Sequence, residues 1–447
     1  MLDQYGDYMR QKINFSNTVT DNNYYFDDIE PPLTNKEAME EASRCLYCYN
    51  APCITACPTH INIPNFIRKI STNNLQGAAE SILEENIFGG SCARVCPTEI
   101  LCEHACVRNT HPESNPVKIG LLQRHAIDNL QGEYPFTRKS DTNKKIAIIG
   151  AGPTGISCAH KLAQLGHSID IFEKESKVGG LNEYGIAAYK LVDNYSELEI
   201  NKILAIGNIN VFTKKTLGEN FFLDDLLDQY HAVFIAIGLA KSKKLNIPGE
   251  LQPNVLDATC FIHTIRQHQV QQNLNGKSAI VIGGGNTAVD VTVQLKKLGA
   301  GKVTLAYRRG HQHMSATLKE QQLAQLHDVH KETWFNPVKI APLTNKKLAV
   351  TFDIHIPETP KETVTLTADY VFKAIGQNLS TQPLFKNNQN ILSVQQYRIA
   401  VNDNYQTSLP GVFAGGDCIS KGQDLTVYAV QQGKEAAENI HAYITGN

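Results

Sequence analysis

The stretch that decides the fold is KKIAIIGAGPTG at residues 144–155. An apolar run, typical of a buried parallel strand, leads into three glycines, and a helical pattern follows from Ile156 to Leu165. A second strand, Ser168–Phe172, ends at Glu173. Glycines at this spacing allow a tight turn and a close approach of the backbone to a pyrophosphate, and the acid can accept hydrogen bonds from a ribose. The alternative is a plain tight turn between strand and helix. The stretch predicts a dinucleotide-binding unit.

The same arrangement returns later in the chain. Ser278–Ile282 leads into GGGNTA at residues 283–288, and after a helical pattern comes the strand Val303–Tyr307. That strand ends in Arg308 and Arg309 instead of an acid. An arginine there can bind the 2′-phosphate of an adenosine, which an acid would repel. The alternative is a pair of solvated surface arginines. We expect a second dinucleotide unit that favours NADPH over NADH.

Three further segments suit late strands of such units, because two end in glycine and the third ends in Gly415-Gly416-Asp417. They are Ala232–Gly238, Asp369–Gly376 and Pro410–Asp417, and a helical pattern follows from Thr426 to His441. Asp417, the last residue of the third segment, could hydrogen-bond a ribitol hydroxyl while the start of the following helix faces a phosphate. Its alternative role is that of an ordinary helix N-cap.

Eight of the eleven cysteines lie between Cys45 and Cys106. They form two groups: Cys45-x2-Cys48-x4-Cys53-x3-Cys57-Pro58 and Cys92-x3-Cys96-Pro97-x4-Cys102-x3-Cys106. Structural zinc sites usually take two Cys-x-x-Cys pairs, and only one is present here. Runs that end in Cys-Pro are typical of two-cluster ferredoxins, where the last cysteine ligates the other cluster. We expect two 4Fe-4S clusters, with zinc or inert thiols as alternatives.

Composition excludes several classes of protein. The 447 residues carry 42 Lys+Arg and 44 Asp+Glu, a formal net charge of -2, which argues against nucleic-acid binding. A transmembrane helix would need about 18 consecutive apolar residues, and no such run occurs. The polar start Met1–Lys12 does not suit a signal peptide. We therefore expect no membrane partner and a cytoplasmic location, which also makes disulfides improbable for the cysteine groups.

These features together resemble a known family. Gly150–Gly155, Glu173-Lys174 with Gly179-Gly180-Leu181, Gly283–Ala288 and Ala414–Asp417 are similar to the flavoproteins with two dinucleotide-binding domains. In that family the first unit holds FAD and the inserted second unit holds NAD(P)H. With its cysteine-rich N-terminus, the chain resembles the small subunit of glutamate synthase and, more closely, the flavin half of dihydropyrimidine dehydrogenase. The resemblance covers about residues 36–445.

The resemblance implies a fold and its divisions. We expect an α/β protein with two Rossmann-like domains, the NAD(P)H domain inserted in the FAD domain, after an all-α iron–sulfur domain. The expected divisions are a helical domain at 1–143, FAD-binding parts at 144–275 and 377–447, and the NAD(P)H domain at 276–376. In the helical domain, Asn35–Leu46, Ile63–Leu83 and Pro116–Leu130 have helical patterns, each expected as one helix.

The resemblance also implies the ligands of the iron. The first cluster would take Cys45, Cys48, Cys53 and Cys106, and the second Cys57, Cys96, Cys102 and Gln123. Cys92 remains a competitor for Gln123 as the fourth ligand of the second cluster. The alternative for Gln123 is a solvated position on a helix.

Further site residues are carried over from the family by position. For FAD they are Val95, Gly150, Ala151, Gly152, Pro153, Thr154, Glu173, Lys174, Gly180, Leu181, Lys190, Leu217, Gly416, Asp417 and Thr426. For NAD(P)H they are Gly284, Gly285, Asn286, Thr287, Arg308, Arg309, Ala374, Ile375 and Gly376. The sequence departs from the family at Ser315, near the position of its second basic residue for the 2′-phosphate, so NADH stays open.

Two absences shape the expected role. No Cys-x-x-Cys stands beside the FAD motifs, which argues against a disulfide reductase of the glutathione type. No residues remain for an FMN-binding barrel, which would need about 250. We expect an enzyme that oxidises NAD(P)H and passes electrons through FAD and the clusters to an FMN-containing partner subunit that reduces uracil or thymine. The alternatives are a glutamate synthase small subunit, a stand-alone NAD(P)H oxidoreductase, or a scaffold without cofactors. Hydride transfer needs no side-chain acid or base, and we assign none.

Overall fold

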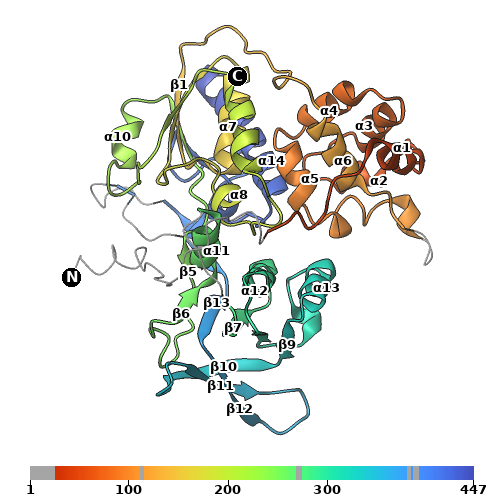
Figure 1. Cartoon of the computed structure of the whole chain (residues 1–447). Coiled ribbons are helices and arrows are strands. Elements are labelled where there is room, and N and C mark those ends of the chain that lie inside the picture. The colour runs from red at the N-terminus through yellow and green to blue at the C-terminus, as the bar shows by residue number, and fades with distance from the viewer. Residues whose placement is uncertain (1–25, 111–114, 268–273, 380–383, 386–391, 447) are drawn as a thin grey trace. The chain divides into compact units, whose positions relative to one another are not determined.

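The computed structural model describes residues 26–110, 115–267, 274–379, 384–385 and 392–446, which form two compact units (Figure 1). The larger unit consists of the described parts of 30–183, 193–241 and 378–446. The smaller unit consists of the described parts of 26–29, 184–192 and 242–377. The smaller unit is therefore inserted between segments of the larger one in the sequence.

A parallel sheet forms the centre of the larger unit, with strand order β17-β4-β1-β2-β3. Its strands are β1 (Lys145–Ile149), β2 (Ser168–Phe172), β3 (Ile209–Phe212), β4 (Ala232–Ile235) and β17 (Val412–Ala414). β1 lies in the middle and is buried from Ile146 to Ile149, as its apolar run predicts. Elsewhere in this unit, β15 (Val394–Gln395) pairs with β16 (Arg398–Ile399) in antiparallel fashion.

Two long helices of the larger unit pack closely together. Ser157 Oγ in α7 (Pro153–Gln164) donates to Val430 O in α14 (Thr426–Thr445) at 2.7 Å. A methyl group added at Gly433 would lie 2.3 Å from Thr154 O, so only glycine allows this approach. The unit also contains the helices α8 (Leu181–Tyr184), whose last residue belongs to the smaller unit, α9 (Tyr195–Leu204) and α10 (Leu223–Leu227).

The cysteine-rich N-terminal part of the larger unit is helical. Its helices are α1 (Asn35–Ser43), α2 (Pro52–Thr55), α3 (Ile63–Ser71), α4 (Leu75–Leu83), α5 (Gly89–Val95) and α6 (Ile119–Asp128), with 3-10 turns at Thr98–Ile100 and Val107–Thr110. α1 begins with a capping box, in which Thr34 N donates to the Glu37 carboxylate at 2.8 Å. Phe66 and Ile127 from these helices and Phe88, which precedes α5, share one buried core with the sheet residues Ile148 and Phe234.

The smaller unit has a second parallel sheet, with order β6-β13-β7-β8-β9. Its strands are β6 (Val255–Asp257), β7 (Ser278–Gly283), β8 (Lys302–Tyr307), β9 (His330–Thr333) and β13 (Tyr370–Ala374). The helices are α11 (Ala258–Arg266), α12 (Asn286–Lys297) and α13 (Leu318–Leu326). An antiparallel sheet consists of β10 (Phe335–Pro342), β11 (Leu348–Ile354) and β12 (Glu362–Ala368). The chain passes between the units at β5 (Lys241–Ser242) and β14 (Gln377–Asn378).

The structure confirms the α/β class with two parallel Rossmann-like sheets and a helical N-terminal region. The single helix expected at Ile63–Leu83 is wrong, because α3 ends at Ser71 and α4 begins at Leu75. Asn73 between them is left-handed with φ 58°, and the side chain of Asn74 caps α4 by accepting from Gly77 N. Among the described helices, none combines the length and the apolar character needed to cross a lipid bilayer.

Candidate functional site

The first predicted glycine turn lies at the carboxyl end of β1, at the start of α7. Gly150 has φ +103°, and a methyl group there would lie 2.4 Å from Ala236 O at the end of the neighbouring strand. Gly152 and Gly180 also approach one another, since a methyl group on Gly180 would lie 2.7 Å from the Cα of Gly152. The glycines of the turn therefore present bare backbone next to the N-terminus of a helix of 12 residues, a suitable place for phosphate.

The acid predicted to bind ribose lies at this turn. Glu173 is buried, and one carboxylate oxygen accepts from Ala151 N at 2.7 Å while the other accepts from Glu175 N at 2.8 Å. In the structure the side chain therefore holds the turn in its conformation. The neighbouring Lys174 forms an ion pair with Glu175 at 3.8 Å.

A second wall of this site comes from the segment after β17. Gly416, with φ +78°, lies so close to Thr154 that an added methyl group would be 2.4 Å from Thr154 Oγ1. Its N–H donates to Gln432 Oε1 at 2.8 Å. Burial raises the pKa of the next residue, Asp417, to about 7, with the nearby charge of Asp424 adding to the rise. A half-buried carboxyl group beside a bare glycine suits a ligand hydroxyl, so these residues fit FAD.

The remaining residues predicted for FAD lie in several places. Thr426 at the start of α14 donates to Asn182 Oδ1 at 2.9 Å, next to the half-exposed Leu181. Leu217 is buried in the core under β1 and β4, and Val95 is the last residue of α5. All four belong to the larger unit.

Lys190, predicted with the FAD residues, lies in the smaller unit. Its ammonium forms ion pairs with Asp290 at 2.8 Å and Glu320 at 2.5 Å, and the hydroxyl of Tyr189 donates to Asp290 at 2.8 Å. Burial alone would lower the pKa of Lys190, but the two carboxylates raise it above its ordinary value. The structure therefore groups Lys190 with α12 and α13, and its role toward FAD stays a prediction.

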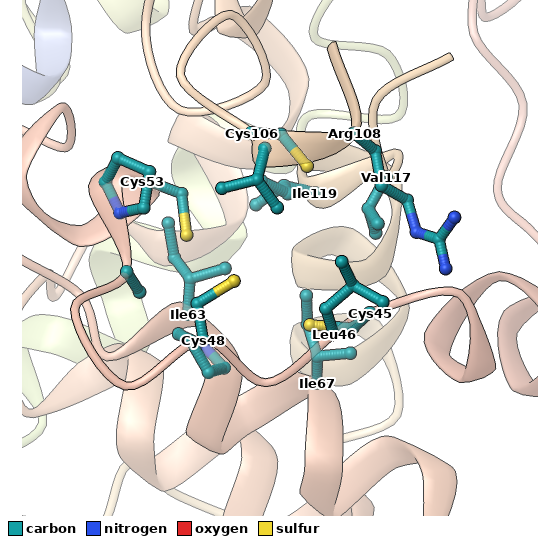
Figure 2. A pocket seen from close by; sticks show the side chains of 14 residues that line it. Cys45, Leu46, Cys48, Cys53, Ile63, Ile67, Cys106, Arg108, Val117 and Ile119 are labelled. Carbon is teal, nitrogen blue, oxygen red and sulfur yellow. The ribbon is translucent and has the colours of Figure 1, made fainter. Parts of the chain in front are cut away.

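In space the cysteines form two groups that differ from the two groups in the sequence, because Cys57 and Cys106 change places, and the first spatial group converges on one cavity. Cys45, Cys48, Cys53 and Cys106 line it, and Figure 2 shows their sulfur atoms among the side chains of Ile63, Ile67, Val117 and Ile119. Burial and the neighbouring Cys106 and Cys45 raise the pKa of Cys53 to about 12. Thiols packed in this way favour the neutral form unless a cation is bound, and a bound metal removes their protons. The donor set fits the first predicted cluster.

The second group gathers Cys57, Cys92, Cys96 and Cys102. A hydrogen bond with Cys92 raises the pKa of Cys96 well above its ordinary value, and burial and the nearby Cys102 and Cys57 add to the rise. Cys92 is thus a direct neighbour of a predicted ligand. Gln123 is buried, and its amide nitrogen donates to Gly89 O at 2.7 Å. A glutamine ligates through its amide oxygen, so this bond is compatible with a ligand role, and both candidates remain.

The spacing of these side chains bears on the kind of metal centre. Within the part of the chain that the structure describes, no three His, Cys, Asp or Glu side chains converge closely enough to hold a single metal ion. Four cysteine thiols around one cavity are a donor set that suits an iron–sulfur cluster, and equally a zinc ion.

Sequence reasoning missed one residue that supports the second group. Glu199 in α9 is fully buried and accepts hydrogen bonds from Gly90 N at 2.8 Å and from Ser91 N at 3.1 Å, and also from the Ser91 hydroxyl. These donors form the first turn of α5, which carries Cys92 and Val95. Burial raises the pKa of Glu199 to about 7, although the hydrogen bonds act against the rise. No local sequence signal marks this role, because the partners are 108 residues or more apart.

The second glycine turn lies at the carboxyl end of β7. A methyl group on Gly283 would lie 2.3 Å from Ala374 O, and one on Gly284 would lie 2.4 Å from the ring of Tyr307. α12 begins at Asn286, directly after the turn, and Thr287 follows in its first turn. The neighbouring strand ends at Ala374, which pairs with Gly283, and Ile375 and Gly376 follow directly. These predicted residues therefore meet at one edge of the sheet.

The two arginines predicted to bind a 2′-phosphate follow β8. Arg308 and Arg309 are exposed, and Arg309 O accepts from Trp334 N at 3.1 Å. Ser315 lies beside the glycine turn, 3.2 Å from the position of a methyl group on Gly285. The site fits the nucleotide half of NAD(P)H, and the arginines are free to turn toward a third phosphate.

Comparisons with known proteins identify two families along the chain. Residues 22–134 match the family described as dihydropyrimidine dehydrogenase domain II, 4Fe-4S cluster, and residues 144–433 match the family described as pyridine nucleotide-disulphide oxidoreductase. The chain is 37% identical over 424 residues to the NAD-dependent dihydropyrimidine dehydrogenase subunit PreT of Salmonella typhimurium, covering 94% of this chain and 97% of that protein. It is 31% identical to the glutamate synthase [NADPH] small chain of Escherichia coli, covering 93% of each.

Solved structures share the fold of the two sheets. Mycobacterium tuberculosis FprA in complex with NADPH superposes with a TM-score of 0.55 at 17% identity, over 68% of this chain and 85% of that one. Lactococcus lactis thioredoxin reductase superposes with a TM-score of 0.54 at 21% identity, over 69% of this chain and all of the other. At these identities the likeness supports the fold alone.

The burial of Glu199 leads to a prediction about stability and pH. Its pKa rises from about 4.5 to about 7 on folding, so between these values the folded chain holds more protons than the unfolded chain. Stability then falls as pH rises through this range, by up to about 3 kcal/mol. Glu199→Gln does not titrate and should lack this fall. Urea unfolding of both proteins at pH 5 and pH 8 measures it.

Glu199→Ala serves as the comparison. It leaves the donors of Gly90 and Ser91 buried without an acceptor, so its free energy of unfolding should be about 2–3 kcal/mol lower than that of the wild type at both pH values. If the free energies of unfolding of wild type and Glu199→Gln differ by the same amount at pH 5 and pH 8, the raised pKa of Glu199 is contradicted.

Proposed function

We propose a role for this chain on the basis of its family. The chain belongs to the pyridine nucleotide-disulphide oxidoreductases and carries an N-terminal 4Fe-4S domain. It is an NAD(P)H-dependent oxidoreductase. In our proposal it is the electron-input subunit of a dihydropyrimidine dehydrogenase. It takes a hydride from NAD(P)H onto FAD and passes single electrons through two 4Fe-4S clusters to an FMN-containing barrel subunit, where uracil or thymine becomes the dihydro form.

The observation that carries this proposal is that both cysteine groups and the first glycine turn belong to one compact unit with a common core. When bound, FAD supplies the step from hydride acceptance to single-electron release, and the clusters carry the electrons onward. The chain's own contribution is to bind and orient. The turn from Gly150 to Gly152 and the helix start would hold the pyrophosphate, and Asp417 a ribitol hydroxyl. Cysteines held by packed helices fix the cluster positions.

Similarity supports the pyrimidine role and leaves one rival. The PreT protein, named as a dihydropyrimidine dehydrogenase subunit, is more similar to this chain than the glutamate synthase small chain, at 37% against 31% identity. Gln123, which the resemblance gives as a cluster ligand in the pyrimidine enzyme, also favours this role. A small subunit of glutamate synthase is the second candidate.

The testing experiment isolates the chain from its native cell with whatever subunit accompanies it. NAD(P)H oxidation is then followed without a substrate, with uracil or thymine, and with glutamine plus 2-oxoglutarate. We expect uracil- or thymine-dependent oxidation and one dihydropyrimidine per NAD(P)H consumed. Dependence on glutamine and 2-oxoglutarate would establish the rival. Oxidation with an artificial acceptor alone would point to a stand-alone oxidoreductase.

The cysteine groups give a second prediction. Cys48→Ser removes one ligand of the first cavity and should lower iron and acid-labile sulfide per chain by about half, because the second group keeps its cluster. Cys260→Ser is the matched control, since Cys260 is an exposed thiol outside both groups. Unchanged iron in Cys48→Ser, or zinc in place of iron, would refute the assignment. The same assay on Gln123→Ala and Cys92→Ala identifies the fourth ligand of the second cluster.

The arginines after β8 give a third prediction. Arg308→Ala should weaken the binding of NADPH by about tenfold or more and leave the binding of NADH nearly unchanged, because a charge-assisted bond to phosphate contributes about 1.5–3 kcal/mol. Steady-state KM values for both cofactors with ferricyanide as acceptor measure it. Equal effects on the two cofactors would show that Arg308 does not bind the 2′-phosphate. The preference matters because the PreT relative is named NAD-dependent and the glutamate synthase chain NADPH-dependent.

A further inference from the structure

We propose that Lys243 binds the pyrophosphate that NADH and NADPH have in common, an inference that rests on the proposed use of these cofactors. Lys243 lies just after β5, far in sequence from the glycine turn, and no motif marks it. Its N–H donates to Gly376 O at 3.0 Å. Its ammonium lies 3.5 Å from the position that a methyl group on Gly376 would occupy. The side chain therefore lies along a bare glycine at the end of β13.

The topology places this glycine at the expected binding crevice. In the order β6-β13-β7-β8-β9, the chain proceeds from β7 outward through β8 to β9 and later returns to β13 on the other side of β7. A ligand of an open parallel sheet binds outside the carboxyl ends of the strands where the order reverses. That point is between β7 and β13. The end of β7 supplies the turn from Gly283 to Gly285, and the end of β13 supplies Gly376 and, through it, Lys243.

The ends of β7 and β13 lie close together at the same edge of the sheet. Ala374 pairs with Gly283, and a methyl group on Gly283 would lie only 2.3 Å from Ala374 O. Gly376 follows two residues later with φ +94°, a conformation that suits glycine. α12, a helix of 12 residues, begins directly after the turn and directs its free N–H groups to the same edge. The ammonium of Lys243 adds a full positive charge to this edge.

The position of Lys243 separates its role from that of the arginines. Arg308 and Arg309 follow β8, on the other side of β7, where the adenosine 2′-phosphate would lie. Lys243 approaches from the β13 side and is exposed, so its ammonium can reach a ligand. A cation that contacts the pyrophosphate strengthens the binding of both cofactors equally. Lys244 is also exposed and provides a matched control one residue away.

The test measures binding of NAD+, NADP+ and ADP-ribose to the flavin- and iron-loaded protein by calorimetry. Lys243→Met should weaken the binding of all three ligands by about tenfold, which is the effect of one charge-assisted bond. This loss of affinity should be smaller at high salt. Lys243→Arg should keep most of the affinity, and Lys244→Met should match wild type. Flavin content and thermal unfolding confirm that each variant is folded.

Three results would overturn the proposal. Lys243→Met binds the three ligands as Lys244→Met does, it loses affinity for NADP+ alone, or it loses NAD+ binding but retains ADP-ribose binding. The last two would place the lysine at the 2′-phosphate or the nicotinamide. Failure of the wild-type protein to bind any of the three ligands would instead refute the cofactor assignment itself, and with it this inference.

Discussion

Both dinucleotide sites depend on one constraint: a strand must end so close to its parallel neighbour that no side chain fits between them. In the larger unit a methyl group on Gly150 would lie 2.4 Å from Ala236 O, and in the smaller unit one on Gly283 would lie 2.3 Å from Ala374 O. Both distances are shorter than real contacts of a methyl carbon. Because the glycines of each turn carry no side chain, backbone N–H groups and the following helix can approach a phosphate directly. The helices α7 and α12 begin immediately after these turns.

Local rules of this kind explain how much of the fold could be predicted. The glycine spacing located β2 and placed β1, β7, α7 and α12 within a few residues of their ends. Ile63–Leu83 was wrong because apolar residues continue at helical spacing through the break, and only the left-handed Asn73 interrupts the backbone. The antiparallel sheet was missed, although β11 alternates buried and partly buried residues from Leu348 to Phe352, the signal of a half-covered strand.

The candidate site was less predictable wherever it depends on long-range contacts. Cysteine spacing indicates which residues share a loop, but it does not show that Cys106 joins Cys45, Cys48 and Cys53 at one cavity. That grouping came from resemblance, and in the structure the four cysteines line one cavity. Glu199 and Lys243 were not found, since each acts through a backbone group more than 100 residues away. Lys190, in contrast, was named in advance as a residue for FAD. Its ion pairs with Asp290 and Glu320 could not be deduced from its position next to the flavin motifs.

The division of the chain matches the different demands of its ligands. Electron transfer between fixed centres needs constant separations, and the cysteine loops and the first glycine turn meet that need by sharing a buried core. Two polar contacts reinforce the link: Glu199 holds the start of α5, and Lys434 of α14 pairs with Glu85 at 2.7 Å. A dinucleotide that binds and dissociates at each turnover does not need a constant separation from the other centres. Its candidate site lies in the other unit, on a sheet with its own hydrophobic core, which can be complete before the cofactor binds.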